Sequence, residues 1–456
     1  MDDPAKPMHA VAVIGGATAG AEVAFRLADH GIRVAVFERN RRPFGKIEDG
    51  LPRWHEKLRN REYERIVERL DRDGVSYVPC TTVGRDVDFR ELVHDWGFAA
   101  VVLANGAWRD RPLTLGSGRD PEPLVGLGLE YQNPLVIGFN HEHDPGFTGH
   151  RPELVDGGAV IGGGLAAIDV AKILNLTATV RALATRGHEV TVEALEHEGI
   201  AICLERLGIT WDELGVRAST IYYRRRVADM PVAQFPEGAD ATKRAKVEAT
   251  REKLVAKVRA KYLVEVVPLA APEDLLVEDG RVVGLVLRRT VIAEGRLIET
   301  AETFEVRHPL VVSSIGSIPE GIDGIPMRGE LYDFVDWHLG TLEGLDKVFA
   351  VGNVLTGKGN IAVSRRHAVE VTDEALEAYL GLREASEDDA NPSQGPQGIA
   401  DAAAQLSEGV ARHAVAQPPL TAEELATLRA RVAERQAAVS YDRDLPAWVA
   451  AIGLTC

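Results

Sequence analysis

Two short glycine-rich segments carry the residue types that bind a diphosphate. Residues 15–20 read GGATAG and residues 162–167 read GGGLAA, and each follows a run of apolar residues. Glycine allows a tight turn and a close approach of the backbone to a pyrophosphate, and a helix that begins at the turn directs its N–H groups at the phosphates. The two segments therefore predict two dinucleotide sites in one chain.

The elements expected around the first segment are those of a parallel, doubly wound sheet. A buried strand from Ala10 to Ile14 leads into the turn, a helix from Ala21 to His30 follows it, and a second strand runs from Arg33 to Phe37. Ala17 stands where the fingerprint has its second glycine, which weakens the match by one methyl group. Glu38, at the end of the second strand, is placed to accept hydrogen bonds from ribose hydroxyls. At this first site we expect Gly15, Ala17, Thr18, Ala19, Gly20, Glu38 and Arg39, with Asn105 and Gly106 at the end of the buried strand Ala99 to Ala104.

The second segment matches the fingerprint more closely. A strand that begins at Ala159 leads into it, and a helix from Ala166 to Leu176 follows, with Asp169 on the opening turn, where an acid also complements the helix dipole. The next strand ends in three arginines, residues 224–226, instead of the acid that would hold the ribose of NAD. Guanidinium groups suit a 2′-phosphate, so we expect NADPH, although a run of arginines can also be a solvated face. At this second site we expect Gly162, Gly164, Leu165, Ala166, Ala167, Asp169, Arg224 and Arg225.

The order of these elements predicts an α/β fold with two Rossmann-like dinucleotide-binding domains. The first domain is expected to be discontinuous, because a short apolar strand from Val348 to Gly352 returns to it after the second. The expected boundaries are residues 1–150 and 331–384 for the first domain, 151–330 for the second with a helical insertion at about 177–216, 385–398 for a flexible linker and 399–456 for a helical extension. We also expect strands at Arg281 to Arg289 and Leu310 to Ile315, helices from Ala362 and from Thr421 to Ala438, and a tail that docks through Trp448 and Ile452.

Composition narrows the class of protein. With 52 basic and 69 acidic residues the formal net charge is -17, which disfavours a nucleic-acid partner. No apolar stretch has the length of a membrane span and the first residues do not read as a signal peptide, so we expect a cytoplasmic location and no membrane association. The three cysteines, Cys80, Cys203 and Cys456, form no CxxC pair and no local metal or cluster site. Electrons would therefore travel on a bound organic cofactor.

Several motifs together resemble the adrenodoxin reductase type of ferredoxin-NADP reductase and its relative, the small subunit of glutamate synthase. The similarity spans about residues 9–380, and it includes residues 44–55 (FGKIEDGLPRWH), which resemble the flavin-side segment of that family. The resemblance implies that Gly45 and Lys46 touch FAD and that His55 lies near the flavin. There His55 could tune the flavin or relay a proton, while a purely structural histidine is an equal alternative.

The same resemblance extends to the second site and to the closing segments. Residues 160–174 look like the NADPH turn and helix, and Tyr223-Arg224-Arg225 before Met230-Pro231 is similar to an element of the glutamate synthase branch. Residues 314–326 and 351–361 resemble the closing flavin segments, although Asn353 stands where relatives often have Trp or Asp. On this resemblance the closing FAD contacts are Gly352, Asn353, Gly359, Asn360 and Ile361. The family implies hydride transfer from NADPH to FAD, followed by one-electron steps to an iron-sulfur protein such as ferredoxin.

Other functions remain open on the sequence alone. A flavin monooxygenase also uses two nucleotide folds, and a flavin-holding subunit of a larger redox complex would need no activity of its own. A flavin-linked disulfide reductase needs a cysteine pair beside the flavin, and Cys80 has no partner nearby in the sequence. The helical insertion or the C-terminal extension could serve a homodimer or a complex.

Overall fold

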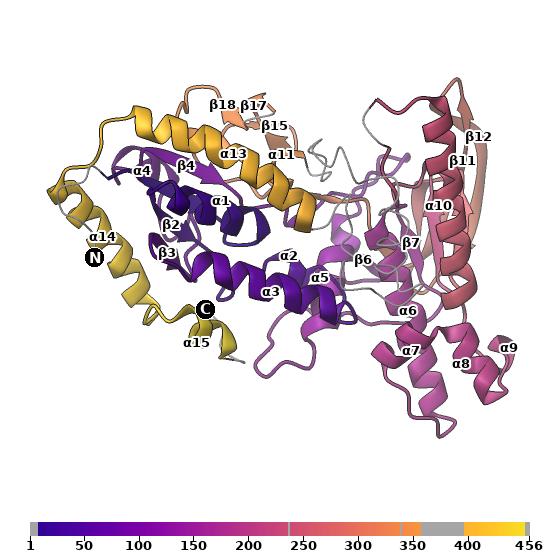
Figure 1. Ribbon diagram of the computed structural model, residues 1–456. Coiled ribbons are helices and arrows are strands. Elements are labelled where there is room, and N and C mark those ends of the chain that lie inside the picture. The colour runs from indigo at the N-terminus through magenta and orange to yellow at the C-terminus, as the bar shows by residue number, and fades with distance from the viewer. Residues whose placement is uncertain (1–7, 236–237, 338–339, 357–395, 452–456) are drawn as a thin grey trace.

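Two lobes lie side by side in the computed structural model, which describes residues 8–235, 238–337, 340–356 and 396–451 (Figure 1). The lobe on the left in Figure 1 holds the N-terminal elements and the helices of the C-terminal segment, and the lobe on the right holds the middle of the chain. No helix in the described part of the chain is long and apolar enough to cross a membrane.

The first lobe is built on a five-stranded parallel sheet in the order β19-β4-β1-β2-β3. Its strands are β1 (Ala10–Ile14), β2 (Arg33–Phe37), β3 (Val75–Val78), β4 (Ala100–Leu103) and β19 (Val348–Ala350). The strands predicted at β1 and β2 are confirmed to the residue, and β4 is one residue shorter at each end than expected. The predicted return of the chain to this sheet is confirmed, because β19 pairs with β4.

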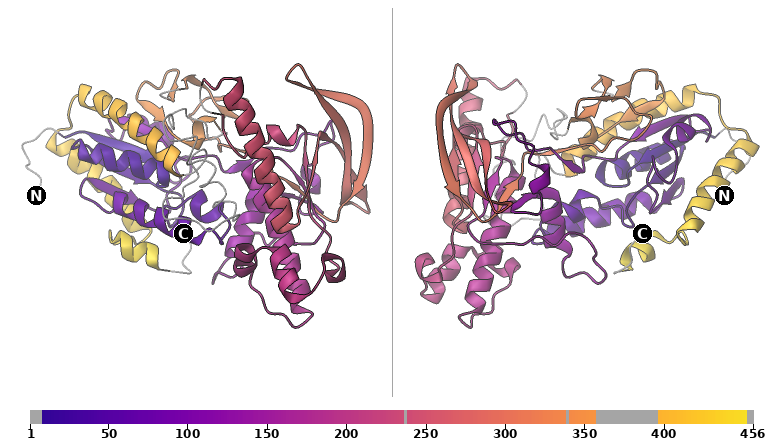
Figure 2. Two further views of the ribbon diagram at one scale, coloured as in Figure 1. Left: turned by 45° about the vertical axis from the view of Figure 1, so that its right-hand side comes forward. Right: turned by 180° about the vertical axis from the view of Figure 1, so that it is seen from behind.

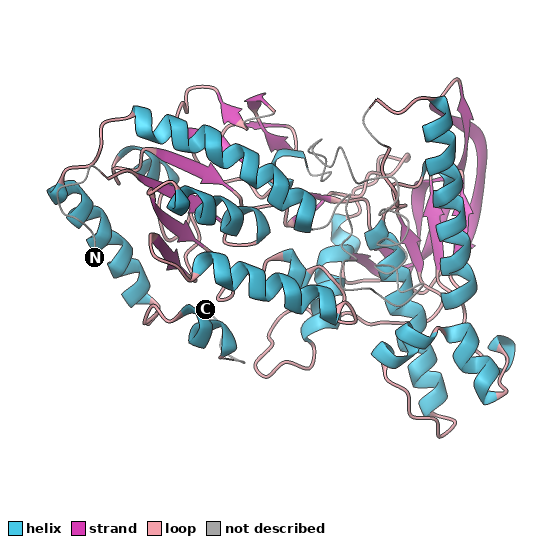
Figure 3. Ribbon diagram, viewed as in Figure 1, coloured by secondary structure: helices cyan, strands magenta, loops and turns pink. Residues whose placement is uncertain are grey.

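Both faces of this sheet are covered, which is why its strands are apolar throughout. Val11 and Val13 of β1 point to one face, and Ala10, Ala12 and Ile14 point to the other. The first face packs against α1 (Thr18–Asp29), α3 (Glu56–Leu70) and α13 (Pro396–Ala416), and the second against α4 (Phe89–His94), α14 (Ala422–Ala438) and the hairpins β15–β16 and β17–β18. These hairpin strands are β15 (Met327–Arg328), β16 (Leu331–Tyr332), β17 (Phe334–Asp336) and β18 (Thr341–Leu342). Figure 3 shows helices on both sides of the strands.

The second lobe repeats the plan with another five-stranded parallel sheet, in the order β6-β13-β7-β8-β9. Its strands are β6 (Leu129–Tyr131), β7 (Ala159–Ile161), β8 (Thr220–Tyr223), β9 (Glu265–Pro268) and β13 (Val311–Ser313). One face packs against α5 (Gln132–His141), α6 (Leu165–Ala184) and α10 (Ala241–Tyr262). The other face packs against an antiparallel sheet of β10 (Ala270–Glu278), β11 (Arg281–Ala293) and β12 (Arg296–Arg307), which forms the outer flank in both views of Figure 2. The strand expected at residues 281–289 therefore lies in this antiparallel sheet and extends to Ala293.

Helices fill the expected insertion between α6 and β8. Helix α6 runs to Ala184, eight residues beyond the predicted end, and is followed by α7 (Val192–Glu198), α8 (Ile200–Leu207) and α9 (Trp211–Leu214). Leu195, Cys203 and Leu204 of these helices join the apolar core around α6 and α10. The insertion thus completes the second lobe, and Figure 1 shows its helices below α6.

The domain boundary expected near residue 150 is wrong. Strand β6 and helix α5, residues 129–141, belong to the second lobe, because β6 pairs with β13. The chain already crosses between the lobes at β5 (Arg109–Asp110), which pairs antiparallel with β14 (Ser317–Ile318) of the returning segment. The return also comes before residue 331, since Ile325 is part of the first lobe's core. Residues 112–149 are rich in proline and glycine, a composition typical of a crossover between domains, whereas tertiary pairing makes most of this stretch part of the second lobe.

The C-terminal helices belong to the first lobe. Helix α13 packs along α1, and Figure 1 shows it in yellow above that helix. Helix α14 begins after Thr421 with a capping box to Glu424, as predicted, and α15 (Leu445–Ala450) carries the buried Trp448. Because α13 begins at Pro396, the last three residues of the predicted linker are helical. The rest of that linker, the helix expected from Ala362 and the docking role of Ile452 lie outside the described residues.

Candidate functional site

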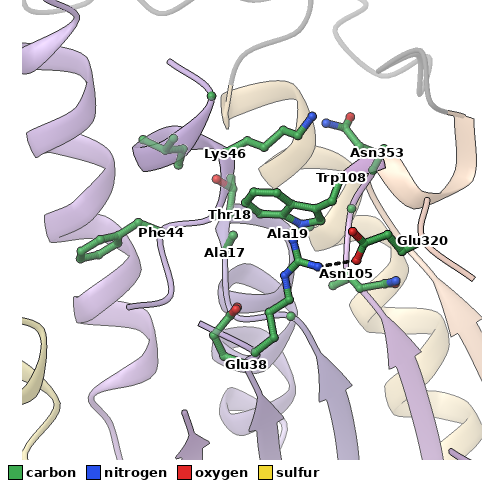
Figure 4. Close-up of a pocket in the computed structure, with 18 of the residues that line it drawn as sticks. Ala17, Thr18, Ala19, Glu38, Phe44, Lys46, Asn105, Trp108, Glu320 and Asn353 are labelled. Carbon is green, nitrogen blue, oxygen red and sulfur yellow. Dashed lines mark hydrogen bonds and ion pairs between the residues drawn. The ribbon is translucent and has the colours of Figure 1, made fainter. Parts of the chain in front are cut away.

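A cavity of about 1770 Å³, including the part open to solvent, lies at the carboxyl ends of β1 and β4. This edge is where doubly wound sheets bind their ligands. Among the predicted site residues, those that line it are Gly15, Ala17, Thr18, Ala19, Glu38, Arg39, Gly45, Lys46, Asn105, Gly106, Leu165, Ala166 and Asn353. Figure 4 shows ten of the lining side chains by name.

The first glycine-rich turn has the geometry that a diphosphate needs. Gly15 has φ +101°, and a Cβ atom there would lie 2.6 Å from the Ala104 carbonyl oxygen. A Cβ atom on Gly20 would lie 1.8 Å from the Gly15 oxygen, so both positions require glycine, although Gly20 does not line the cavity. Ala17 caps α1 with φ −73°, a conformation open to any residue. A Cβ atom on Gly45 would lie 2.9 Å from the Ala17 methyl group. The absence of a side chain at Gly45 therefore leaves space for alanine where the fingerprint has its second glycine.

Glu38 lies where the sequence predicted it, at the end of β2, but its carboxylate already has backbone partners. Its Oε2 accepts a hydrogen bond from the Gly16 N–H (2.8 Å) and its Oε1 accepts one from the Asn40 N–H (2.9 Å). Burial raises the pKa of Glu38. Carboxylate oxygens have further lone pairs, so Glu38 can both fix the turn and accept hydrogen bonds from a ribose.

Arg39 and Trp108 form the wall next to Glu38. The Arg39 guanidinium lies 4.3 Å from the centroid of the Trp108 ring and forms an ion pair with Glu320. Asn105 donates from Nδ2 to the Tyr332 hydroxyl at 3.2 Å. The sequence analysis missed Trp108 and Glu320, and their only signal was proximity to Asn105-Gly106 and to the closing segment.

Lys46 is the first residue of α2 (Lys46–Asp49), directly after Gly45. Its Nζ donates to Asn133 Oδ1 (3.0 Å) and to Ser317 Oγ (2.9 Å). Burial lowers the pKa of Lys46 to about 8, and burial raises the pKa of nearby Asp110 to about 6. Sequence reasoning did not single out Asn133, Ser317 or Asp110, which lie on the crossing segments and on α5, far from Lys46 in the chain.

His55 lies behind the cavity wall and is buried. Its Nε2 accepts a hydrogen bond from the Trp54 indole N–H (3.1 Å), which in the neutral ring places the proton on Nδ1. The same Nε2 is 3.8 Å from Asp169 Oδ1, on the helix that begins at the second turn. The structure therefore brings together two residues that the sequence assigned to different sites.

The second glycine-rich turn borders the same cavity. Gly162 has φ +153°, and a Cβ atom there would lie 2.1 Å from the Ser314 carbonyl oxygen. A Cβ atom on Gly163 would lie 2.4 Å from the Tyr223 ring, so this turn packs closely between β13 and β8. Helix α6 begins at Leu165, and Leu165 and Ala166 reach the cavity. The two turns thus approach one space from opposite lobes.

The arginine run follows β8 at the carboxyl edge of the second sheet. Arg226 is held by Asp229, with Nη2 2.8 Å from Oδ1 and Nε 3.0 Å from Oδ2. Arg225 donates to the Gly295 carbonyl (3.3 Å), and Arg224 has an exposed side chain. Thr290 Oγ1 donates to the Arg224 carbonyl (2.7 Å), which fixes the backbone of this run to β11.

The closing segments are described in part. Gly352 has φ +77° and precedes α11 (Asn353–Thr356), so Asn353 enters the cavity from a helix start. Gly359, Asn360 and Ile361 lie outside the described residues. Cys80, which has no partner nearby in the sequence, is disulfide-bonded, and Cys203 is a free buried thiol. Cys80 precedes Thr81, which lines the cavity near Glu38.

Comparison with known proteins identifies the family. A family model described as pyridine nucleotide-disulphide oxidoreductase matches residues 9–375. The chain belongs to that family. Among curated members, the glutamate synthase [NADPH] small chain of Azospirillum brasilense is 31% identical over 249 residues, covering 51% of this chain and 50% of that protein. The corresponding protein of Mycobacterium tuberculosis (strain ATCC 25618 / H37Rv) is 37% identical over 105 residues, covering 23% and 21%. These alignments span half or less of the relatives' length.

Among solved structures, Mycobacterium tuberculosis FprA in complex with NADPH superposes with a TM-score of 0.62. It is 20% identical in sequence, and the match covers 94% of this chain and 91% of FprA. This similarity concerns the fold, and the present chain has two nucleotide-binding lobes. FAD and a pyridine nucleotide are accordingly its cofactors, and the two close-packed glycine turns have the geometry that two dinucleotides need.

Proposed function

We propose that the protein is an NADPH-dependent flavoprotein reductase that passes electrons, one at a time, to an iron-sulfur protein of the ferredoxin type. One observation carries the proposal: the first glycine-rich turn and the start of α6, directly after the second turn, border a single cavity, so a ring held by one lobe can meet a ring held by the other. FAD, when bound, supplies the chemistry that accepts a hydride and releases single electrons.

The chain's own residues would bind and orient the cofactors. We assign the Gly15 to Gly20 turn to the FAD diphosphate and Glu38 to the adenosine ribose, at the end of the cavity farthest from the second lobe. We assign Gly45, Lys46 and Asn353, which also line the cavity, to the rest of the FAD, and Lys46 is joined to Asn133 of the second lobe. Hydride transfer needs stacked rings and little water, which the wall of Trp108 and Leu165 supports.

NADPH is favoured over NADH by the residues after β8. Arg226 is committed to Asp229, whereas Arg224 is exposed and Arg225 is only loosely held, so these two guanidinium groups can turn to a 2′-phosphate. No acid occupies the strand end that would hold the 2′-hydroxyl of NADH. His55, next to Asp169 at the meeting point of the lobes, is the side chain assigned to hold or relay a proton near the ring.

The assignment of the acceptor rests on the family resemblance and on the cysteines. A disulfide acceptor within the chain would need a cysteine pair at the ring end of the cavity, whereas Cys80 follows β3 near Glu38 and Cys203 is buried in α8. An iron-sulfur protein is a one-electron acceptor that needs no such pair.

The test is an anaerobic titration of the purified protein with NADPH and with NADH. We expect the flavin absorbance to bleach with NADPH and only weakly with NADH, and to recover when a ferredoxin panel is added. Protein without flavin, or equal bleaching by the two nucleotides, contradicts the cofactor assignment. Rapid consumption of oxygen and NADPH with a small substrate would identify a monooxygenase instead.

A further inference from the structure

Lys46 is a half-buried cation whose two hydrogen-bond partners are both neutral. Its Nζ donates to the amide oxygen of Asn133 and to the hydroxyl of Ser317. An ammonium group has three N–H donors. Within the described residues two of them are used, and Lys46 lines the cavity, so the third is available to a group bound there.

Lys46 lies at the end of the cavity where the FAD ring must be. The ring has to meet the nicotinamide, so it must occupy the end that Leu165 and Ala166 of the second lobe border. Asn133, which is bonded to Lys46, lines this end as well and lies on α5 of the same lobe. Figure 4 shows the Lys46 side chain extended toward the side of Trp108 and Asn353, and its Nζ is 5.8 Å from the Trp108 ring centroid.

Charged side chains of both signs act on the Lys46 ammonium. Burial is the largest influence on its pKa and lowers it to about 8, while Asp110, Asp49 and Glu320 raise the pKa and Arg39 lowers it. A poorly solvated ammonium gains more from a new anion than an exposed one does, because the local dielectric is low. A negative charge that forms on a group bound next to Nζ can therefore pair with Lys46.

We propose that Lys46 is the counter-charge of the reduced FAD ring. This inference rests on the proposed function. In the reduction, the C–H bond of the dihydronicotinamide breaks and the hydride carries two electrons to the ring, so that nicotinamide is oxidised and the ring is reduced with a net gain of one negative charge. A Lys46 that is already protonated pairs with that charge, and a neutral Lys46 takes one proton from water to do so.

The pH dependence of flavin reduction in the parent protein tests this role without any substitution. At a fixed electrode potential, the ratio of reduced to oxidised flavin should fall about tenfold per pH unit below pH 8. Above pH 8 it should fall about a hundredfold per unit, because reduction then takes up two protons instead of one. Spectroelectrochemical titration between pH 6 and 10 measures this ratio.

Substitutions should move or remove the change of slope near pH 8, which we call the break. Lys46→Met should remove the break and lower the reduced-to-oxidised ratio at pH 7 about tenfold, which equals about 30 mV for a two-electron couple. Asp110→Asn should move the break to lower pH, because Asp110 raises the pKa of Lys46. Lys57→Met, on the exposed side of α3, is the matched control and should leave the curve unchanged.

A single slope of about tenfold per unit in the parent protein overturns the proposal, as does a Lys46→Met protein that retains the break. If Lys46→Met cannot hold FAD, the parent titration and Asp110→Asn decide the question alone. A protein that binds flavin and is bleached by NADPH but shows no break refutes only the role of Lys46. A protein without flavin refutes the proposed function and this inference together.

Discussion

The side chains after β8 decide which pyridine nucleotide the second lobe prefers. We expect Arg225→Ala or Arg224→Ala to raise the KM for NADPH about 10- to 100-fold with little change in the KM for NADH, because each removes a charge-assisted hydrogen bond to the 2′-phosphate. Steady-state kinetics with both nucleotides measures this selectivity. Arg226→Ala is the internal control, because Arg226 is paired with Asp229. We expect this substitution to raise the KM for NADPH less than about threefold. Equal increases in the KM values for NADPH and NADH would argue that residues 224–226 have a structural role.

The carboxyl group of Asp110 makes folding depend on pH in the acid range. Its pKa is raised by burial from the ordinary 3.8 to about 6, so between these values the folded protein binds more protons than the unfolded chain. Stability contributed by this group is therefore present below pH 4 and is lost as the pH rises through 6. Relative to the parent, Asp110→Asn should gain up to about 3 kcal/mol in free energy of unfolding above pH 6 and almost nothing below pH 4. Urea unfolding of both proteins at pH 4, 5, 6 and 7 measures the difference, and a constant difference across this range would contradict the assignment.

The second turn contains two glycines with opposite tolerance to a side chain. Gly162→Ala should lower the free energy of unfolding by about 2 kcal/mol or more, because its φ is +153° and the new methyl group would meet the Ser314 carbonyl. Gly164→Ala should be nearly neutral for folding, since Gly164 has φ −86° and no atom within 4 Å of the added carbon. Thermal unfolding of the apoproteins compares the pair. If Gly164→Ala nevertheless weakens nucleotide binding, then the nucleotide occupies the open space beside Gly164.

Helix α13 is a structural part of the first lobe rather than an independent appendage. Val410 is fully buried against the face that carries α1, whereas Val415 of the same helix is 58% exposed. Val410→Asp should cost about 4 kcal/mol or more and release FAD, because it buries an unpaired charge. Val415→Asp should be tolerated. Similar losses in the two variants, measured by urea unfolding, would show that α13 is not packed in this way.

Local patterns in the sequence predicted most of the sheet but not its tertiary connections. Glycine turns after apolar strands placed β1, β2, β7 and α6, because their determinants lie within about twenty consecutive residues. The edge strand β6 was missed, since a three-residue strand inside a proline- and glycine-rich stretch has no periodicity to detect.

The candidate site also contains residues that local motifs predicted and residues that only tertiary contacts bring to it. The glycine turns, Glu38 and Lys46 were named from local motifs, and Gly15, Glu38 and Lys46 border the cavity, whereas Gly16, Gly20 and Gly162 to Gly164 do not. Trp108 and Asn133 reach the cavity only because β5 pairs with β14 and α5 lies against α2, and such contacts leave no mark in a single sequence. Whether each named residue binds its cofactor stays a prediction.

The whole molecule should unfold differently with and without its flavin. The cavity takes side chains from both lobes and from the returning segment around Glu320, so bound FAD links elements that otherwise have separate cores. We expect one calorimetric transition for the holoprotein and two for the apoprotein, with the first lobe gaining about 2.7 kcal/mol at a flavin concentration of 100 Kd. Differential scanning calorimetry before and after flavin removal measures this. Two transitions that are unaffected by FAD would mean that the flavin contacts only one lobe.

The packing of α13 on α1 also determines how late in biosynthesis the first lobe can complete its fold. Strand β1 leaves the ribosome first, but β19 and α13, which complete its sheet and cover its face, are made more than 300 residues later. At about 5–20 residues per second this delay is on the order of 15 to 80 s, during which the inserted lobe can fold on its own. The half-built first sheet therefore passes through this part of synthesis with an uncovered apolar face, and flavin insertion has to wait until α13 has been made.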